Sequence, residues 1–129
     1  MPLFAQNIVY YTASMKAIFE WDVNQKNISD PKHPMIEQLH AISSVLKAKT
    51  SWYASECIHE CREMLGGHGY SSYSKMGVLF NDNDVNHTWE GDNHVLIQQT
   101  SKYVLEQAQR VLQKGKQTNN PILTFINNV

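Results

Sequence analysis

The sequence predicts an all-α protein, an antiparallel bundle of three substantial helices. Three stretches place apolar residues at steps of three and four, which is the spacing of one helix face. Residues that start and stop helices stand at the ends of these stretches. No stretch alternates between apolar and polar residues, except weakly at residues 77–80. Because the middle helix is long, it needs long neighbours, and a bundle is expected.

The first expected helix covers residues 3–22. Its apolar residues form one stripe at helical spacing: Phe4, Ile8, Tyr11, Met15, Ile18 and Phe19. The segment VNQKNISDPKHP that follows is polar and contains two prolines. We therefore expect an exposed connection there.

The second helix is expected to begin at Pro34, which suits the first helical position, with Glu37 in the first turn. Its apolar face is interrupted only around Lys49. The residues of that face are Ile36, Leu39, Ile42, Leu46, Tyr53, Cys57, Cys61 and Met64. Gly66 and Gly67 are expected to stop the helix after roughly 30 residues.

Asp92 or Asn93 is expected to cap a third helix, because a side-chain oxygen there accepts hydrogen bonds from first-turn amides. Lys114 followed by Gly115 is a common helix end. The predicted inner face consists of Ile97, Thr100, Val104, Ala108 and Val111. We assign residues 1–115 to one helical bundle domain. Residues 116–129 are expected to be a linker and the start of a following helical segment.

The 129 residues are 42% hydrophobic and 18% charged, which is ordinary for a soluble globular domain. The formal net charge of −1 offers no electrostatic attraction to nucleic acid or to a membrane surface. No apolar run approaches the ~20 residues that span a bilayer. The start MPLFAQ lacks signal-peptide features, so we expect an intracellular protein, and FINNV is not a Ser-Lys-Leu peroxisomal address.

Cys57 and Cys61 lie one helical turn apart. They can be read as a metal half-site completed by His68 or His87, but two buried thiols against a neighbouring helix are the preferred interpretation. Three residues occupy the first, third and fifth positions of an EF-hand pattern: Asp82, Asp84 and Asn86. The sixth position, which must be glycine, is His87, so we reject a calcium site. The spacing of the histidines matches no closed zinc site, and no metal is expected.

Two motifs stand out: Gly66-Gly67-His68-Gly69 followed by Tyr70, and TWEGDN, which leads into HVLIQQTSKYVL. In this order and separation they resemble the C-terminal α-helical domain of the acyl-CoA oxidases, flavoenzymes of the acyl-CoA dehydrogenase superfamily. The run GVLFNDND is most similar to the branched-chain, or pristanoyl, type of peroxisomal oxidase. The resemblance covers roughly residues 35–112, and such oxidases are several times longer than this chain.

The resemblance implies an enzyme that binds FAD and converts an acyl-CoA and O₂ into the trans-2-enoyl-CoA and H₂O₂, as a homodimer in the peroxisome. Glu90 is the catalytic base in this comparison, removing the α-proton while a hydride leaves the β-carbon for the flavin. The backbone N–H of Glu90 and a ribityl hydroxyl of FAD are expected to stabilise the enolate oxygen. Trp89 is expected to shield the carboxylate from water, and Gly91 to allow a sharp turn.

The resemblance also names the residues expected to contact FAD: Gly66, Gly67, Gly69, Gly91 and Asp92. In related enzymes the first three contact the cofactor of the partner subunit, with His68 beside them. Asp92 stands where the dehydrogenases carry a small hydroxyl residue, which favours an oxidase. Tyr70 and Trp89 are expected to line the acyl or flavin cleft. Outside this comparison, Gly-Gly commonly just ends a helix, and Asp92 or Asn93 is a good helix cap.

A second hypothesis belongs to a different class of protein. The chain has no counterpart of the β-domain with which the family binds the flavin ring. It is then a non-catalytic helical module that works only through assembly. Three helices leave apolar faces without a partner, which predicts a dimer or larger assembly.

Overall fold

The computed structural model describes residues 2–27, 33–114 and 124. The regular elements within these ranges are all helical, which confirms the all-α prediction. They are α1 (Pro2–Asn24), η1 (Gln25–Asn27), α2 (Pro34–Met64), α3 (Gly67–Tyr70), η2 (Ser72–Ser74), α4 (Met76–Asp84), η3 (Val85–His87) and α5 (Asn93–Lys114). No helix in the described ranges combines the length and apolar character that crossing a membrane requires.

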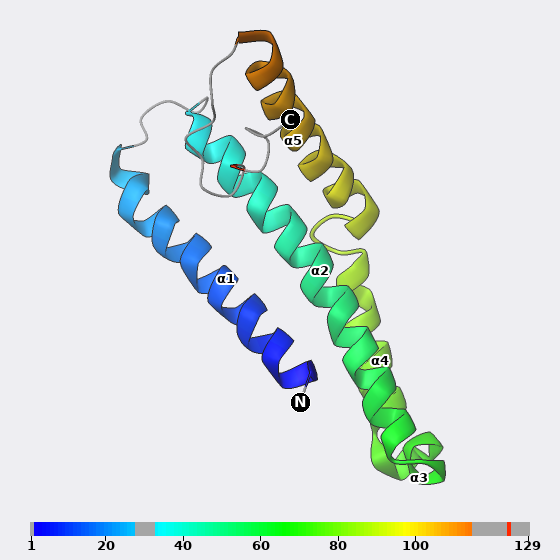
Figure 1. The fold of residues 1–129 in the computed structure, drawn as a ribbon. Helices are drawn as coiled ribbons and strands as arrows, with labels where there is room; N and C mark the ends of the chain where they lie inside the picture. Colours follow the sequence, from blue (N-terminus) through cyan, green and yellow to red (C-terminus); the bar gives the residue numbers. More distant parts are fainter. Residues whose placement is uncertain (1, 28–32, 115–123, 125–129) are drawn as a thin grey trace.

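Helix α2 is the element on which the other helices pack (Figure 1). Helix α1 lies along one side of α2, and α4 and α5 follow one another along another side. The chain reverses direction at each end of α2, so the predicted antiparallel arrangement is confirmed (Figure 1). The boundary at residue 115 stays a prediction, and the expected linker lies outside the described residues except for Thr124.

Both ends of α2 follow the signals in the sequence. Pro34 is its first residue, and the Met35 amide donates a hydrogen bond of 3.3 Å to His33 Nδ1. The helix ends at Met64 after 31 residues. Gly66 then takes φ +57°, a left-handed conformation that glycine adopts without a Cβ clash. The predicted start, stop and length of this helix are confirmed.

Small side chains let α2 and α5 approach closely. Ala48 is fully buried and Ala41 nearly so, and the Thr100 hydroxyl donates a 3.1 Å hydrogen bond to the Ala41 carbonyl. All five residues of the predicted inner face of α5 are half-buried: Ile97, Thr100, Val104, Ala108 and Val111. Leu96 is more deeply buried than any of them, and the sequence analysis did not include it.

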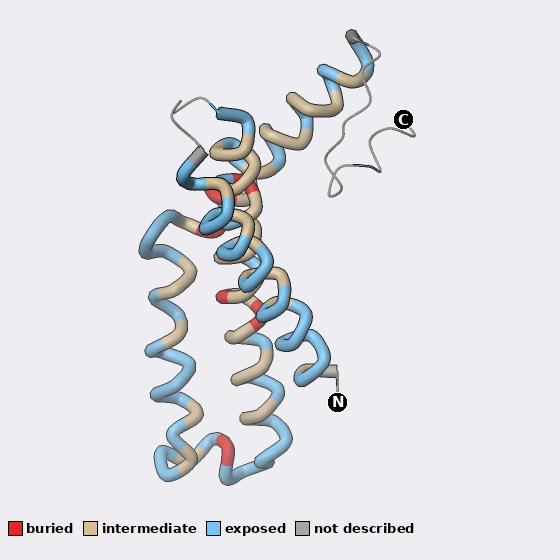
Figure 2. Tube along the Cα trace, turned by 90° about the vertical axis from the view of Figure 1, so that its left-hand side faces the viewer, coloured by how far each residue is buried: buried red, intermediate tan, exposed pale blue. Residues whose placement is uncertain are grey.

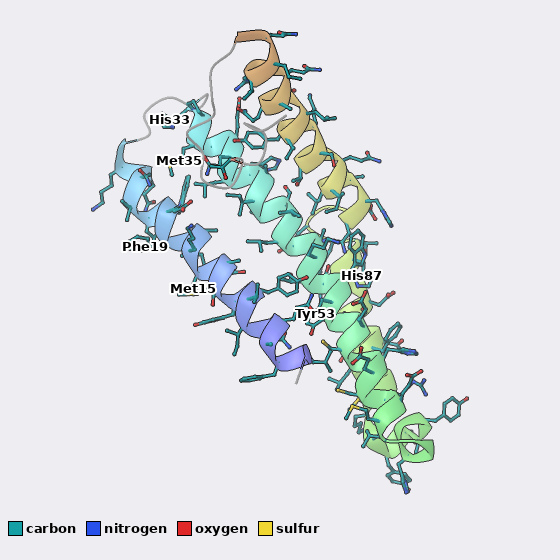
Figure 3. All side chains as sticks on the ribbon, in the orientation of Figure 1. Met15, Phe19, His33, Met35, Tyr53 and His87 are labelled. Carbon is teal, nitrogen blue, oxygen red and sulfur yellow. The ribbon has the colours of Figure 1, made fainter. Side chains whose placement is uncertain are left out.

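Helix α1 meets α2 through a mixed face, and most of its apolar stripe lies on the opposite side of the helix. The Tyr10 ring packs edge-on against Tyr53 with centroids 5.4 Å apart, and Tyr53 donates a 3.0 Å hydrogen bond to the Leu3 carbonyl. Figure 3 shows Tyr53 between the two helices, with Met15 and Phe19 on the other side of α1. The predicted stripe is exposed throughout: Phe4, Ile8, Tyr11, Met15, Ile18 and Phe19. Figure 2 shows how little of α1 is buried.

The segment between the two motifs contains a helix that was not among those expected. Helix α4 spans nine residues, although Asn and Asp have low helix propensity. Packing on α2 offsets that propensity, and Asn83 donates a 2.8 Å hydrogen bond to the Ser55 hydroxyl of α2. The expectation of three helices was therefore incomplete. Helix α4 lies at the surface, where every one of its residues is exposed or half-buried.

Candidate functional site

The turn that carries Glu90 has an unusual backbone. Glu90 has φ +56° and Gly91 has φ +105°, so two consecutive residues lie in the left-handed region. A non-glycine residue rarely adopts a positive φ, and such strain often marks a functional position. This turn lies where η3 ends and α5 begins, about halfway along α2 (Figure 1).

Gly91 is required by the shape of this turn. Besides its positive φ, a Cβ at this position would stand 3.1 Å from Leu96 Cδ2 and 3.3 Å from its Cγ. Leu96 is itself buried, so its side chain has little room to shift. The expectation that Gly91 permits a sharp turn behind Glu90 is confirmed.

The sequence left open whether Asp92 or Asn93 caps α5. Asp92 Oδ1 accepts hydrogen bonds from the His94 amide at 2.9 Å and the Val95 amide at 3.3 Å, so Asp92 is the helix cap. Asn93 is 1% exposed, and its amide donates a 2.8 Å hydrogen bond to the Ser51 hydroxyl. The capping carboxylate and the buried amide together fix the direction in which α5 leaves the turn.

Lys47 is a residue of this site that the sequence analysis missed. From the middle of α2 its ammonium donates to the Gly91 carbonyl at 2.6 Å and to Asn93 Oδ1 at 2.8 Å. The available signal was polar spacing, because Lys47, Ser51 and Ser55 recur every four residues along a helix whose other face is apolar. That strip of α2 faces the α4–α5 junction.

A polar hollow of about 270 Å³ opens beside Glu90. Its lining comes from α2, α4, η3 and the turn: Lys47, Thr50, Ser51, Ala54, Asn83, Asn86, Trp89 and Glu90. The Trp89 indole N–H donates a 2.7 Å hydrogen bond to Asn86 Oδ1, which ties the ring to η3. Glu90 and Trp89 are both exposed, so within the described residues Trp89 does not shield the Glu90 carboxylate from water as expected.

At the junction of α4 and α5, a serine, a histidine and an aspartate contact one another in a row. His87 Nε2 is 3.0 Å from the Ser55 hydroxyl, and His87 Nδ1 is 3.6 Å from Asp84 Oδ1. His87 Nε2 is also 3.1 Å from the Ser51 carbonyl, which only accepts hydrogen bonds. Nε2 therefore carries the hydrogen in the arrangement that satisfies both oxygens, and it cannot accept a proton from Ser55. We interpret His87 as a brace between α2 and η3 (Figure 3), because the group lacks an activated nucleophile.

The glycine cluster lies at the far end of α2 and combines open and packed positions. A Cβ at Gly66 or Gly67 would meet nothing within 4 Å. Gly69 is buried, and a Cβ there would collide with the Arg62 carbonyl and stand 3.1 Å from Leu65 Cβ. The missing side chains thus leave the backbone accessible at two positions, while the third lets α3 pack on α2.

A second hollow, of about 540 Å³, lies beside this cluster. It combines an apolar wall with cations, and Tyr70 is one of its lining residues. The expected place of Tyr70 at an acyl or flavin cleft stays a prediction. The cations are Arg62 and Lys75, and the apolar wall includes Ile58, Val78 and Phe80. Cations beside an apolar wall can accommodate an anionic group attached to a flat ring.

The metal patterns in the sequence do not form coordination sites here. Asp82 and Asp84 lie within helix α4, which lacks the curved loop that calcium coordination needs. Among the described residues, no group of three or more His, Cys, Asp or Glu side chains is arranged to hold a metal ion. Cys57 and Cys61 are free and half-buried.

Comparison with protein families gives a match over residues 1–105 to the model described as "Acyl-CoA oxidase, C-alpha1 domain". The chain belongs to the acyl-CoA oxidase family. The match includes both motifs and starts earlier than the motif resemblance, so it also covers α1. The all-α fold is the one that this helical domain leads us to expect.

Several individual acyl-CoA oxidases are similar to this chain, each over a different stretch of it. "Peroxisomal acyl-coenzyme A oxidase 3" of Homo sapiens is 52% identical over 68 residues, which cover 53% of this chain and 10% of that protein. "Acyl-coenzyme A oxidase 2, peroxisomal" of Arabidopsis thaliana is 32% identical over 118 residues, covering 92% of this chain and 17% of that protein. "Acyl-coenzyme A oxidase 2" of Candida maltosa is 44% identical over 85 residues, covering 66% and 12%. The chain therefore matches less than a fifth of the length of these relatives.

The two motifs of this acyl-CoA oxidase domain lie apart in the fold. Helix α4 separates them, and its nine residues span about 14 Å. Figure 1 shows α3 at one end of α2, whereas α5 begins near the middle of α2. Glu90 and the glycine cluster therefore do not converge on one site within the described part of this chain.

Proposed function

We propose that this chain supplies the general base of a peroxisomal, flavin-dependent acyl-CoA oxidase. The reaction converts an acyl-CoA and O₂ into the trans-2-enoyl-CoA and H₂O₂. The observation that carries the proposal is Glu90, held in a left-handed turn beside a polar hollow within the residues that match the family. The peroxisomal location rests on the names of two relatives.

Glu90 accepts the α-proton of the thioester substrate in this proposal. An exposed carboxylate is a weak base for such a proton, so the surrounding protein has to exclude water and stabilise the developing enolate. The backbone N–H of Glu90 is the proposed donor to the enolate oxygen. The left-handed conformation matters here because it determines where both the N–H and the side chain point.

The glycine end suits part of a dinucleotide cofactor. Gly66 and Gly67 leave their backbone open to a ligand, and Arg62 and Lys75 supply positive charge for phosphates. FAD, when bound, accepts the hydride from the β-carbon and passes the electrons to O₂. Gly69 acts indirectly by letting the cluster pack on α2, while Gly91 and Asp92 shape the turn at Glu90.

The separation of the two motifs favours a homodimer. Because α4 keeps the glycine cluster away from Glu90, each end is proposed to serve a different flavin, with the glycines contacting the cofactor of the partner subunit. A site shared in this way needs two copies of the chain.

A second function, assembly without catalysis, is favoured by a different observation. The apolar stripe of α1 is exposed, with Phe4 and Phe19 each more than two-thirds exposed. Such a stripe is typical of a surface that another helix covers. In this case the chain keeps the Glu90 motif but takes no part in catalysis, and its role is to pack against other subunits or domains.

Replacement of Glu90 tests the two functions against each other. In the flavin-loaded oxidase, Glu90→Gln keeps the size of the side chain but removes the base, so turnover should fall by at least ~10²-fold at unchanged flavin content. Glu56→Gln, an exposed carboxylate on α2, is the matched control and should leave turnover within about twofold. Normal turnover in the Glu90 variant would leave assembly as the better account.

A further inference from the structure

Lys47 makes a long-range contact with the Glu90 turn that surface lysines do not usually make. Its ammonium lies 2.6 Å from the Gly91 carbonyl, 44 residues away in sequence, and 2.8 Å from Asn93 Oδ1. Lys47 is half-buried and lies on α2, the longest helix of the fold. A rigid helix therefore holds the peptide group that directly follows Glu90.

Asn93, one of the two groups that accept hydrogen bonds from Lys47, is itself held in place. Asn93 is almost fully buried, and its amide donates to the Ser51 hydroxyl at 2.8 Å and to the Ala48 carbonyl at 3.4 Å. All three contacts of Asn93 run to α2. When Lys47 binds Asn93 and Gly91 together, it ties the start of α5 and the turn to one stretch of α2.

The turn needs such a restraint. Glu90 and Gly91 both have positive φ, and a strained backbone persists only where surrounding contacts determine it. Asp92 restrains the far side of the turn through the α5 amides, but the Gly91 carbonyl has Lys47 as its partner. Loss of the ammonium would let the peptide between Gly91 and Asp92 rotate, and Glu90 would move with it.

We infer that Lys47 is a positioning residue for Glu90: by binding the Gly91 carbonyl and the Asn93 side chain together, it holds the turn in the conformation that aims the Glu90 carboxylate and N–H. This inference rests on the proposed role of Glu90 as the base. Lys47 touches neither substrate nor cofactor in this account. A displacement of about 1 Å at a reacting group is enough to lower a rate by ~10²-fold.

A pair of lysine variants on α2 tests the inference. Lys47→Met removes the charge at similar side-chain length, and Lys49→Met is the matched control, an exposed lysine whose ammonium lies 5.9 Å from the Trp52 ring centroid. In the flavin-loaded oxidase, Lys47→Met should lower kcat at least ~10-fold with KM for acyl-CoA and flavin content within about twofold. Amide exchange of His94 and Val95 should quicken as the turn loosens. Lys49→Met should change none of these quantities.

Two kinetic results for Lys47→Met would overturn the inference. Unchanged kcat in Lys47→Met would show that the turn does not depend on the ammonium. A rise in KM at unchanged kcat would make Lys47 a substrate-binding group in the polar hollow. If Lys47→Met loses flavin or unfolds, Lys47→Gln is the gentler variant, and it should lower kcat at least about threefold at unchanged KM. If Lys47→Gln has the wild-type kcat, or if it also loses flavin, the inference is wrong and Lys47 has only a structural role.

The Glu90→Gln variant, measured beside these proteins, separates the two claims. If Glu90→Gln loses turnover while Lys47→Met keeps it, only the role of Lys47 fails. If Glu90→Gln keeps normal turnover, the proposed function fails, whatever Lys47→Met does to amide exchange.

Discussion

Gly91 and Gly77 are both glycines, yet their surroundings differ in a way that predicts opposite effects of alanine. At Gly91 the positive φ and the 3.1 Å approach to Leu96 oppose any Cβ. At Gly77, in the first turn of α4, a Cβ would meet nothing within 4 Å. Gly91→Ala should lower the free energy of unfolding by about 1–3 kcal/mol, whereas Gly77→Ala should raise it by up to about 1 kcal/mol.

Denaturant unfolding of the chain, followed by circular dichroism, measures both changes. Equal effects of the two substitutions would contradict the strained turn described here. Stabilisation by Gly91→Ala would contradict it more strongly.

Gly67 offers a cleaner test of cofactor contact than its neighbours. It has no positive φ and no atom near its absent Cβ, so Gly67→Val should leave helix content nearly unchanged. In the oxidase, the branched side chain should obstruct the cofactor and lower FAD affinity, measured by flavin release. A variant that binds FAD normally but unfolds at lower temperature would make Gly67 only a helix stop.

At the level of elements, local signals predicted α2 and α5 well. Pro34 and Gly66 delimit α2, and Asp92 caps α5, because these residues act through their own backbone or nearest amides. The Glu90 turn and the glycine cluster were recognised as motifs, but their backbone angles were not foreseeable. Gly66, and not Gly67, proved to have the left-handed conformation.

Helix α4 and Lys47 escaped prediction for the same physical reason. Helix α4 forms where Asn83 meets Ser55, and Lys47 matters because Asn93 and Gly91 lie opposite it. Each contact joins residues more than 25 positions apart, and no local pattern encodes which long-range partners will meet. Tertiary contacts of this kind regularly override propensity.

The contact between α1 and α2 predicts a specific alkaline response. Burial first, and hydrogen bonding with Cys57 second, raise the pKa of Tyr53 to about 12. In the unfolded chain this phenol ionises near its usual pKa of about 10. Between about pH 10 and 12 the folded state keeps a proton that the unfolded state releases, so stability falls as pH rises.

Tyr53→Phe isolates this effect. It removes the 3.0 Å hydrogen bond to the Leu3 carbonyl, so it should lower the free energy of unfolding at neutral pH. It should also flatten the loss of stability above about pH 10, measured by urea unfolding at several pH values. Tyr11→Phe, on the exposed stripe, should retain the wild-type slope. Parallel slopes for wild type and Tyr53→Phe would contradict the assignment.

For the whole molecule, the exposed stripe of α1 predicts association. Tyr11 and Ile18 are both more than half exposed, and the purified chain should cover them by pairing with another copy. Tyr11→Lys and Ile18→Lys should shift the mass toward that of a monomer in light scattering. Ala5→Lys, on an exposed part of α1 outside the stripe, should leave the mass unchanged. A wild-type monomer would contradict this prediction.

The isolated chain should also be colourless and inactive toward acyl-CoA. A base accelerates proton removal only when substrate and flavin are held within about 3–3.5 Å of the reacting geometry. Glu90 is exposed in the described structure, and the two motifs face different places. An absorption spectrum after incubation with FAD and gel filtration measures the outcome, and a yellow, active protein would contradict it.

The central claim, that Glu90 accepts the α-proton, is tested most directly by proton exchange. The substrate is an acyl-CoA whose β-carbon carries no hydrogen to transfer, incubated in D₂O with the flavin-loaded oxidase. Loss of the α-hydrogens, followed by NMR, then reports removal of the proton alone. Wild type and Glu56→Gln should exchange at similar rates, and Glu90→Gln should be slower by at least ~10²-fold. Exchange at the wild-type rate in Glu90→Gln would contradict the claim.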